Sequence, residues 1–329
     1  MIPTIDLFSG IGGFSYALNS IAKTQAYCDV NLNCRNVLNN LIDKKLIDKA
    51  IIFDDITLLK GNDLKHLNPK MLTGGFPCTD ISTANNNGKG LNGKHSGLFF
   101  EIMRIIDETP SIKYVLLENS PVIRIRGLSR IRKEFKKRNF KLVWGYFSAK
   151  MVGALHKRKR WVCFGYKELD NDLQLIDDNY IKYNWTKTIK PLIIKKTDEN
   201  KSYMTRCMML SNTVVPQMIR YSWNILIKNA LIQNEVKVIK DLCNNDKKII
   251  LNDGINKIIK QRWATPTFTR WEQYRILTER AGQMISNQIY YKHDLQVDPN
   301  IPINMRDKHY RISPNFIEHL MGYPKNWTV

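Results

Sequence analysis

The sequence predicts an α/β protein in which helices cover both faces of a largely parallel sheet, with a smaller loop-rich domain attached. In the first half of the chain, short apolar runs alternate with segments of helical periodicity, which is the pattern of βαβ units. The first apolar run passes directly into a glycine-rich turn, DLFSGIGG. The chain has 329 residues, of which 43% are hydrophobic, and this is enough for one large α/β domain and a smaller one.

Seven apolar runs are predicted to form the strands of this sheet. They span residues 2–8, 26–30, 50–53, 71–73, 114–118, 142–147 and 161–166. Between them, GLFFEIMRIIDE spaces its apolar side chains for one face of a helix that packs on the core. Another amphipathic helix is expected after Pro216, and the polar segment 167–204 is interpreted as a variable connection. Residues 229–310, rich in Asn, Lys and aromatic residues, are interpreted as a loop-rich lobe.

The charge of the chain indicates a polyanionic partner. The formal net charge is +21, and nucleic acid is the usual partner of so basic a protein. A lysine bias from an AT-rich genome is the alternative explanation. The basic residues are concentrated in segments 124–141 and 156–160, and this clustering favours nucleic acid.

The cysteines and the N-terminus indicate the compartment. The six cysteines are scattered and include no Cys-x-x-Cys pair, which argues against a disulfide framework and against a zinc site. The N-terminus has no basic region followed by a long apolar one, and no apolar run approaches the length of a membrane span. We therefore expect an intracellular, soluble protein with no membrane partner and no metal.

The turn after the first strand favours a cofactor with an adenosine group. Gly10, Gly12 and Gly13 allow a tight turn and the close approach of a ligand. A dinucleotide-binding GxGxxG pattern would need glycine at position 15, where the sequence has serine, so a pyrophosphate is the weaker interpretation. Asp29 lies at the end of the second strand, where an acid accepts hydrogen bonds from ribose hydroxyls, and Asp55 follows the third. Ordinary turns of a doubly wound fold are the alternative.

A cysteine follows the fourth strand, in the stretch GGFPC. Cys78 is either a packing residue, the commoner role of a free cysteine, or a nucleophilic thiolate. Glu118 ends the fifth strand in LLENSP, and Arg158 and Arg160 lead into the seventh in HKRKRWV. Because ligands of open α/β sheets bind at the carboxyl ends of the strands, these side chains are expected to converge. Taken singly, the Glu-Asn pair is also compatible with a simple turn, and the basic run with a solvated edge.

Together these motifs resemble the cytosine-C5 DNA methyltransferase family, whose members use S-adenosylmethionine (AdoMet). DLFSGIGG resembles the first motif of the family, GGFPC its nucleophile motif, GLFFEIMRI the helix that follows, LLENSP its Glu-Asn motif and GALHKRKRWVCFGY its QxRxR motif. RISPNFIEHLMGYPKNW resembles the ninth motif and SNTVVPQ the tenth. The resemblance covers residues 2–166, 210–220 and 311–328, and it implies a Rossmann-like AdoMet-dependent methyltransferase sheet with a small target-recognition domain.

The resemblance implies a covalent route for methyl transfer to C5 of cytosine. It assigns to Cys78 the thiolate that adds to C6 of the base, which makes C5 nucleophilic enough to accept a methyl group. It implies that protonated Glu118 binds N3 and that Asn119 orients the segment before the nucleophile. Arg160 is implied to contact the base and Arg158 to steady the active-site loop, and both supply positive charge that favours the thiolate.

The resemblance also implies a cofactor pocket formed by the glycine-rich turn and the strand ends. Adenine would lie between apolar side chains, with Asp55 at its amino edge. The ribose would contact Asp29, and the methionine part would lie above the glycines. Phe8 and Leu98 are equally compatible with a core position. The residues implied are Phe8, Gly10, Gly12, Gly13, Asp29, Val30, Asp55, Ile56, Pro77, Leu98, Asn212 and Val214.

The expected partner is double-stranded DNA, bound by a monomer. The target carbon is inaccessible inside a duplex, so the cytosine has to be flipped out. The segment TDISTANNNGKGLNGKHSG, rich in Gly and Asn, fits a loop that closes over the flipped base, although a surface loop without that role has the same composition. Ser82, Lys94 and His95 are the candidates for contacts with the DNA backbone.

Three positions depart from the family pattern. His156 stands in place of the Gln of QxRxR, His95 in place of a frequent Arg, and Ser211 in place of a customary Gly before Asn212. None of these changes removes the nucleophile or the acid.

The order of the motifs also departs from the usual one. The segment that resembles the tenth motif precedes the segment that resembles the ninth, which is similar to the arrangement of some phage-type members. This order predicts an AdoMet-binding catalytic domain over residues 1–220. A target-recognition domain is predicted over residues 221–329, and residues 311–328 within it resemble the ninth motif.

Two other functions remain as alternatives. A tRNA cytosine-C5 methyltransferase of the same fold would share the Cys and Glu motifs, but its usual Cys-Phe-Thr signature is absent from the sequence. A catalytically silent DNA-binding protein would keep the fold, and the intact set of Cys, Glu-Asn and Arg motifs argues against it.

Overall fold

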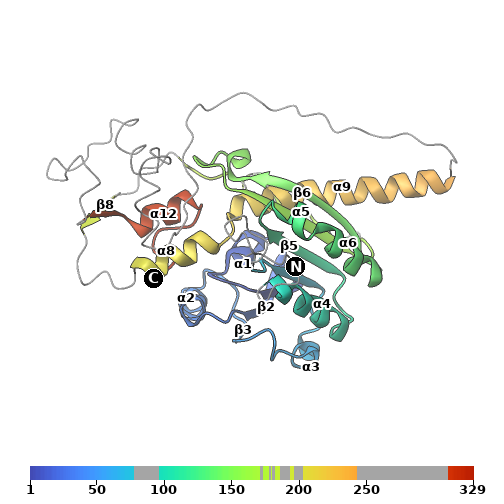
Figure 1. Ribbon diagram of the computed structural model, residues 1–329, viewed down its shortest axis with the longest axis horizontal. Coiled ribbons are helices and arrows are strands. Elements are labelled where there is room, and N and C mark those ends of the chain that lie inside the picture. The colour runs from blue at the N-terminus through green and yellow to red at the C-terminus, as the bar shows by residue number, and fades with distance from the viewer. Residues whose placement is uncertain are drawn as a thin grey trace.

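In the computed structural model the chain folds around a seven-stranded sheet with strand order β3-β2-β1-β4-β5-β7-β6 (Figure 1). The structure describes residues 1–77, 96–170, 173–177, 179, 182–185, 193–195, 203–242 and 310–329. Strands β1 to β5 run parallel, whereas β7 is antiparallel to both of its neighbours, β5 and β6. The predicted α/β class is confirmed: β7 enters between β5 and β6 in an otherwise doubly wound order.

Each of the seven predicted strands coincides with a strand of this sheet. The largest difference is in β2, which begins at Ala22 rather than at residue 26, because its first half alternates exposed polar and buried small side chains. The strands are β1 (Ile2–Leu7), β2 (Ala22–Cys28), β3 (Ile51–Phe53), β4 (Met71–Gly74), β5 (Tyr114–Asn119), β6 (Lys141–Ser148) and β7 (Lys159–Tyr166), and a separate pair is formed by β8 (Ile193–Lys195) and β9 (Tyr310–Ile312).

The helices alternate with the strands through the first half of the chain. They are α1 (Gly13–Leu18), α2 (Leu32–Asp43), α3 (Gly61–Leu64), α4 (Phe99–Glu108), α5 (Ile123–Arg126), α6 (Leu128–Lys137), α8 (Tyr203–Asn212), α9 (Pro216–Leu242) and α12 (Pro314–Leu320), with 3-10 turns at Lys65–Leu67, Ser96–Leu98 and Ala149–Val152. The predicted helices after Gly97 and after Pro216 correspond to α4 and α9.

Two hydrophobic cores lie on opposite faces of the sheet. Neighbouring strand residues alternate between them: Met71 and Leu116 join the core beneath α1, α2 and α9, whereas Leu72 and Leu117 join the core beneath α3, α4 and α6. Both faces are therefore buried, as in parallel sheets generally, which accounts for the nearly continuous apolar runs of β4 and β5.

The register of the sheet aligns the carboxyl ends of the parallel strands. Phe53 pairs with Cys28, Cys28 with Leu7, Leu7 with Gly74, and Gly74 with Leu117. The chain thus leaves five neighbouring strands at one edge, where ligands of doubly wound sheets bind.

The C-terminal segment packs on the same core as the N-terminal half of the chain. Trp223 and Leu226 of α9 and Met321 and Trp327 near the C-terminus are fully or almost fully buried in the core beneath α1. The predicted domain boundary at residues 220 and 221 therefore falls inside α9, and this helix continues to Leu242, past the predicted start of the loop-rich lobe at residue 229. The rest of the predicted recognition region, residues 243–309, lies outside the described residues.

Among the residues that the structure describes, no helix is both long and apolar enough to cross a membrane.

Candidate active site

The glycine-rich turn lies at the carboxyl end of β1 and is built from unusual backbone conformations. Phe8, Gly10 and Gly12 all have positive φ angles, of 54°, 55° and 75°. Such a conformation is uncommon for a bulky residue, and strained residues of this kind cluster at ligand sites. Apart from its own chain neighbours, no atom of the described residues lies within 4 Å of the place where a side chain of Gly10 would begin. The turn thus forms an open cradle beside the sheet.

Asp29 holds this turn against the end of β2. One of its carboxylate oxygens accepts a hydrogen bond from the backbone N–H of Gly10 at 2.7 Å, and the other accepts one from the N–H of Asn31 at 2.9 Å. Burial raises the pKa of Asp29, and the two backbone hydrogen bonds oppose that shift. Each oxygen keeps a second lone pair, so the carboxylate is able to accept hydrogen bonds from a diol as well.

The C-terminal segment closes on the other side of the turn. The indole N–H of Trp327 donates to the carbonyl oxygen of Ile11 at 2.8 Å. A side chain at Gly13 would begin 2.5 Å from the Oη of Tyr323 and 2.7 Å from a methyl carbon of Val214, so only glycine fits there. The turn is therefore clamped by residues from the far end of the chain.

Tyr323 joins this clamp to the segment that resembles the tenth motif. Its hydroxyl lies 2.7 Å from the Oγ1 of Thr213 and donates to the carbonyl oxygen of Val214 at 3.0 Å. Arg158 approaches the same segment from β7: it donates to the carbonyl oxygen of Ser211 at 2.9 Å and also to that of Thr213. Arg158 is only 2% exposed, and its guanidinium fixes the backbone beside the glycine-rich turn.

His156, which stands where the family has Gln, makes a different connection. Its Nε2 lies 2.6 Å from the carbonyl oxygen of Leu320 and donates to it, so the neutral ring carries its proton on Nε2. Burial lowers the pKa of His156 to about 4, and the nearby guanidinium groups of Arg158 and Arg160 act in the same direction. This histidine is therefore a neutral link between the start of β7 and α12.

A buried acid faces a guanidinium at the end of β5. Glu118 is 8% exposed, and its Oε1 lies 2.8 Å from the Nε of Arg160. Burial raises the pKa of Glu118, while Arg160 and then Arg158 act to lower it, and burial prevails. The carboxyl group therefore holds its proton to a higher pH than a solvated glutamic acid does, as a hydrogen-bond donor to a base requires.

Asn119 fixes the backbone just before Pro77. Its side-chain amide donates to the carbonyl oxygen of Phe76 at 3.0 Å, and its Oδ1 accepts from the N–H of Ser120 at 2.7 Å. The Oε2 of Glu118 would lie 3.3 Å from a side chain on Gly75. The acid, the amide and the end of GGFP thus lie together at the edge of β4 and β5.

The other predicted cofactor residues lie at the ends of β2 and β3 and on the elements beside them. Ile56 is 5% exposed, whereas Val30 is 75% exposed beside the half-buried Asp29. Asp55 uses one oxygen to accept from both the N–H and the hydroxyl of Thr57, at 2.8 Å each. Leu98 and Pro77 are half-buried, and Asn212 is exposed.

The nucleophile and the proposed DNA contacts are not placed by the structure. Cys78, Ser82, Lys94 and His95 lie outside the described residues, so their roles remain predictions. Within the described ranges, no group of three or more His, Cys, Asp or Glu side chains is arranged to hold a metal ion.

Three residues that frame the site escaped the sequence analysis. Asp6, in the middle of β1, is fully buried; one oxygen accepts from the hydroxyl of Thr73 at 2.6 Å, and burial raises its pKa to about 7. Its charge inside an apolar run was the available signal. Tyr323 and Trp327 belong to the segment that resembles the ninth motif, but nothing local in that segment indicates that it meets the turn.

The residues at this edge fit an adenosine-bearing cofactor such as AdoMet. The open side of Gly10 leaves room for a ligand against the backbone, and Asp29 offers free lone pairs at the end of β2. Buried Ile56 and half-buried Leu98 provide apolar surface on neighbouring elements.

Sequence comparisons with known proteins show the family of the chain. The family model for C-5 cytosine-specific DNA methylases matches residues 2–329. The chain is 31% identical over 224 residues to the type II methyltransferase M.CviJI of Paramecium bursaria Chlorella virus IL3A, covering 67% of this chain and 58% of that protein. It is 26% identical over 165 residues to the tRNA (cytosine(38)-C(5))-methyltransferase of Schizosaccharomyces pombe, covering 49% of this chain and 48% of that protein.

Among solved structures, a Spodoptera frugiperda DNMT2 mutant is similar with a TM-score of 0.46 and 19% identity, covering 63% of this chain and 65% of that one. The chain spans about half of the length of the curated relatives that it matches. Because the family match extends from the first strand to the last residue, the chain belongs to the C-5 cytosine-specific DNA methylase family.

Proposed function

We propose that the protein is a DNA (cytosine-5)-methyltransferase that modifies a flipped cytosine through a covalent bond between Cys78 and C6. One observation carries the proposal: the buried Glu118, paired with Arg160 at 2.8 Å, lies beside the backbone that leads directly to Cys78. The glycine-rich turn and Asp29 lie at the same edge of the sheet. An acid, a guanidinium and a cofactor cradle are thus available to one base.

Burial makes three of the four described cysteines poor nucleophiles. Burial raises the pKa of the thiols of Cys28 and Cys34 to about 12, and it raises the pKa of Cys163 as well. A thiol with a raised pKa contains almost no thiolate at neutral pH. Cys78 follows a strand at the site edge and is preceded by the backbone that Asn119 fixes, so we assign the attack to it.

In the proposed reaction the thiolate of Cys78 adds to C6 of cytosine while Glu118 donates a hydrogen bond to N3. Glu118 thereby stabilises the charge that builds on the ring, and Arg160 binds the base and holds the acid in place. The bound AdoMet supplies the methyl group to C5. Loss of the C5 proton to a base then lets the bond between C6 and sulfur break, which releases the thiolate and the product.

For the cofactor, we propose that the turn of Gly10, Gly12 and Gly13 holds the methionine part and that Asp29 binds the ribose hydroxyls. Adenine would lie among apolar side chains with the free oxygen of Asp55 at its amino edge. The other residues proposed to line this pocket are Phe8, Val30, Ile56, Pro77, Leu98, Asn212 and Val214. We propose that the reaction needs no metal.

We propose double-stranded DNA as the partner and assign the charge at the site edge to its phosphates. Arg124 lies on α5, the helix that follows β5, and Lys159 is the first residue of β7, the strand that pairs with β5; both are exposed. The ammonium of Lys159 lies 5.5 Å from the centre of the Tyr146 ring. An exposed cation beside an aromatic ring near this edge of the sheet suits a phosphate backbone, whose binding depends on charge. Ser82, Lys94 and His95 are proposed to add further contacts.

A tRNA substrate is the second candidate, and the sequence similarity that supports it is weaker. The relative named as a tRNA methyltransferase shares less identity, over less of the chain, than the type II methyltransferase does. We further propose that the protein is a monomer that acts inside the cell on DNA, as part of a restriction-modification pair. We also propose a phage-type motif order, in which the tenth motif precedes both the recognition region and the ninth motif.

Methylation of genomic DNA by the purified protein with AdoMet, followed by bisulfite sequencing, tests the activity and reveals the target site together. We expect 5-methylcytosine at one short sequence. Labelling of tRNA without labelling of DNA would contradict the proposal and favour the second candidate.

Trapping with 5-fluorocytosine tests the nucleophile. Duplex DNA with this base at the target should form a covalent adduct with the wild type and with Cys34→Ser, whose thiol is buried, but not with Cys78→Ser. An adduct that persists in Cys78→Ser would remove Cys78 from this role.

A further inference from the structure

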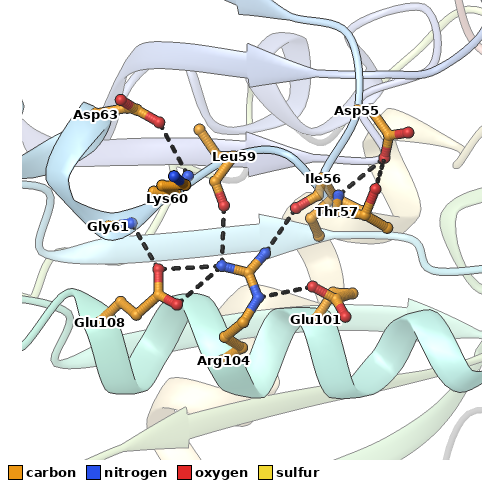
Figure 2. Close-up of polar contacts among 10 residues, drawn as sticks. All are labelled: Asp55, Ile56, Thr57, Leu59, Lys60, Gly61, Asp63, Glu101, Arg104 and Glu108. Carbon is orange, nitrogen blue, oxygen red and sulfur yellow. Dashed lines mark hydrogen bonds and ion pairs between the residues drawn. The ribbon is translucent and has the colours of Figure 1, made fainter.

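One arginine fastens the loop after β3 to helix α4. The two Nη atoms of Arg104 donate to the carbonyl oxygens of Ile56 at 2.8 Å and of Leu59 at 2.9 Å. The Arg104 side chain is 30% exposed, whereas Ile56 and Leu59 are 5% and 3% exposed. Figure 2 shows the guanidinium lying between the loop and the helix, with its donors directed at the two carbonyl groups.

Two acids of the same helix orient the guanidinium. Its Nε donates to Glu101 at 2.7 Å, and Nη1 donates to both oxygens of Glu108 at 3.0 Å (Figure 2). Glu108 in turn accepts the backbone N–H of Gly61 at 2.7 Å. A side chain on Gly61 would begin 2.4 Å from the backbone of Glu108, so the loop can approach the helix this closely only with glycine. The loop is thus bound to α4 at three backbone groups.

This contact joins two walls of the cofactor pocket described under the proposed function. Ile56 follows Asp55 at the end of β3, and Leu98 immediately precedes the first residue of α4. The turn that Asp55 makes with Thr57 leads into the carbonyl groups that Arg104 holds. A shift of the loop away from α4 would therefore move the Asp55–Ile56 backbone relative to Leu98.

We propose that Arg104 is a positioning residue for the adenine end of the cofactor site: it fixes the separation between the Ile56 segment and α4 and so sets the affinity for the adenosine part of the cofactor. The proposal rests on the proposed function for the identity of the cofactor. Arg104 does not touch the reacting atoms, so its effect is on binding rather than on the rate of methyl transfer.

Arg138 provides a matched control. It also binds α4 through a double contact, from Nε and Nη2 to Asp107 at 2.7 and 2.6 Å, and it also binds Glu134. Its side chain is 20% exposed, comparable to that of Arg104. Its hydrogen-bond partners in the described part of the chain are Asp107 and Glu134 and include no carbonyl group of the Ile56 loop, so its loss should disturb α4 without moving the pocket wall.

Calorimetric titration with S-adenosylhomocysteine, and with adenosine alone, tests the proposal. Arg104→Gln should weaken both ligands about tenfold, because two carbonyl contacts and their orienting ion pairs are lost, whereas Arg138→Gln should stay within about twofold of the wild type. In methylation assays the KM for AdoMet should rise by a similar factor, with kcat at saturating AdoMet within about twofold. Arg104→Lys keeps the charge but not the forked geometry and should fall between the two.

The outcomes separate this proposal from the function on which it rests. Wild-type binding that Arg104→Gln leaves unchanged would refute the positioning role alone, and so would equal weakening by Arg138→Gln. Absence of binding to the wild type would refute the cofactor assignment and this proposal with it. If Arg104→Gln does not fold, Arg104→Lys and Glu101→Gln give the same comparison with smaller expected shifts.

Discussion

The two ends of the proposed cofactor site are held in different ways. At the glycine-rich turn, Trp327 reaches Ile11 across more than three hundred residues of chain, and every group involved is buried. At the adenine end, Arg104 donates hydrogen bonds to the carbonyl oxygens of Ile56 and Leu59, fewer than fifty residues away, and the ion pairs that orient its guanidinium are about one-third exposed. One end depends on burial and the other on a charged contact near solvent.

The difference indicates how each end should respond to perturbation. Buried contacts strengthen in a low dielectric and leave costly unpaired groups when one partner is lost. Partly exposed ion pairs contribute little to global stability, because water and salt screen them. We therefore expect changes at the turn to lower the free energy of unfolding, and changes at Arg104 to act mainly on ligand affinity.

The largest expected effect is that of Trp327→Ala. Trp327 is fully buried, and removal of so large a side chain should lower the free energy of unfolding by about 4 kcal/mol. Trp327→Phe keeps most of the packing but not the N–H for Ile11 and should lower it by about 1–2 kcal/mol. Urea denaturation measures both. A loss below about 1 kcal/mol for Trp327→Ala would show that the C-terminal segment does not support the turn.

The next effect is a pH dependence of the free energy of unfolding that arises from the buried carboxyl group of Asp6. Burial raises the pKa of Asp6 to about 7, so between about pH 4 and pH 7 the folded state holds a proton that the unfolded state has released. Stability from this group is therefore fully present below about pH 4 and is lost as the pH rises through 7, by several kcal/mol at most. The stability of Asp6→Asn relative to the wild type should rise over this window and level off above it.

The pH dependence of stability that Glu108 contributes, at the adenine end, has the opposite sign. Hydrogen bonds from Gly61 and Arg104 lower the pKa of Glu108, so its contribution is present above the unfolded pKa and is lost as the pH falls. Unfolding curves from about pH 2 to pH 8 for the wild type, Asp6→Asn and Glu108→Gln would show the two windows separately. Identical curves for the wild type and Asp6→Asn would contradict the burial of a protonated Asp6.

A third comparison replaces a glutamate with glutamine at each end of the proposed cofactor site. Glu318 is fully buried and accepts from Arg206 at 2.9 Å and from the N–H of Thr328 at 2.9 Å, so Glu318→Gln should lower the free energy of unfolding by about 3 kcal/mol. Glu108→Gln, at a side chain that is 36% exposed, should lower it by less than about 1 kcal/mol. Equal losses in urea denaturation would remove the distinction between the two ends.

At the glycine-rich turn, the smallest expected effect on the free energy of unfolding is that of replacing Tyr323 with phenylalanine. Loss of its hydroxyl leaves Thr213 and Val214 without a hydrogen bond that each now makes, and it should lower the free energy of unfolding by about 1–2 kcal/mol. S-adenosylhomocysteine should also bind a few times more weakly. Tyr166→Phe removes a buried hydroxyl at the opposite end of the sheet, where Tyr166 pairs with Tyr114 at the start of β5, and serves as the control, with no change in binding expected.

The sequence by itself determined the sheet and the strand ends that carry polar groups. Short apolar runs separated by helical patterns indicate an α/β fold, and parallel strands bring their carboxyl ends to one edge of the sheet. For this reason the positions of Asp29, Glu118 and Asn119 at that edge were predictable. The start of β2 was missed because its alternation of exposed polar and small buried residues carries little hydrophobic signal.

Only the tertiary structure decided what lies against the turn and how the pocket walls are joined. The contacts of Trp327 with Ile11 and of Tyr323 with Thr213 join segments separated by 316 and 110 residues, and no local pattern encodes such a pairing. Arg104 lies on a helix whose apolar face was evident, but the two carbonyl groups that it binds belong to a loop 48 and 45 residues away. Local propensity and periodicity report on neighbours in sequence, whereas these contacts arise from the packing of the whole chain.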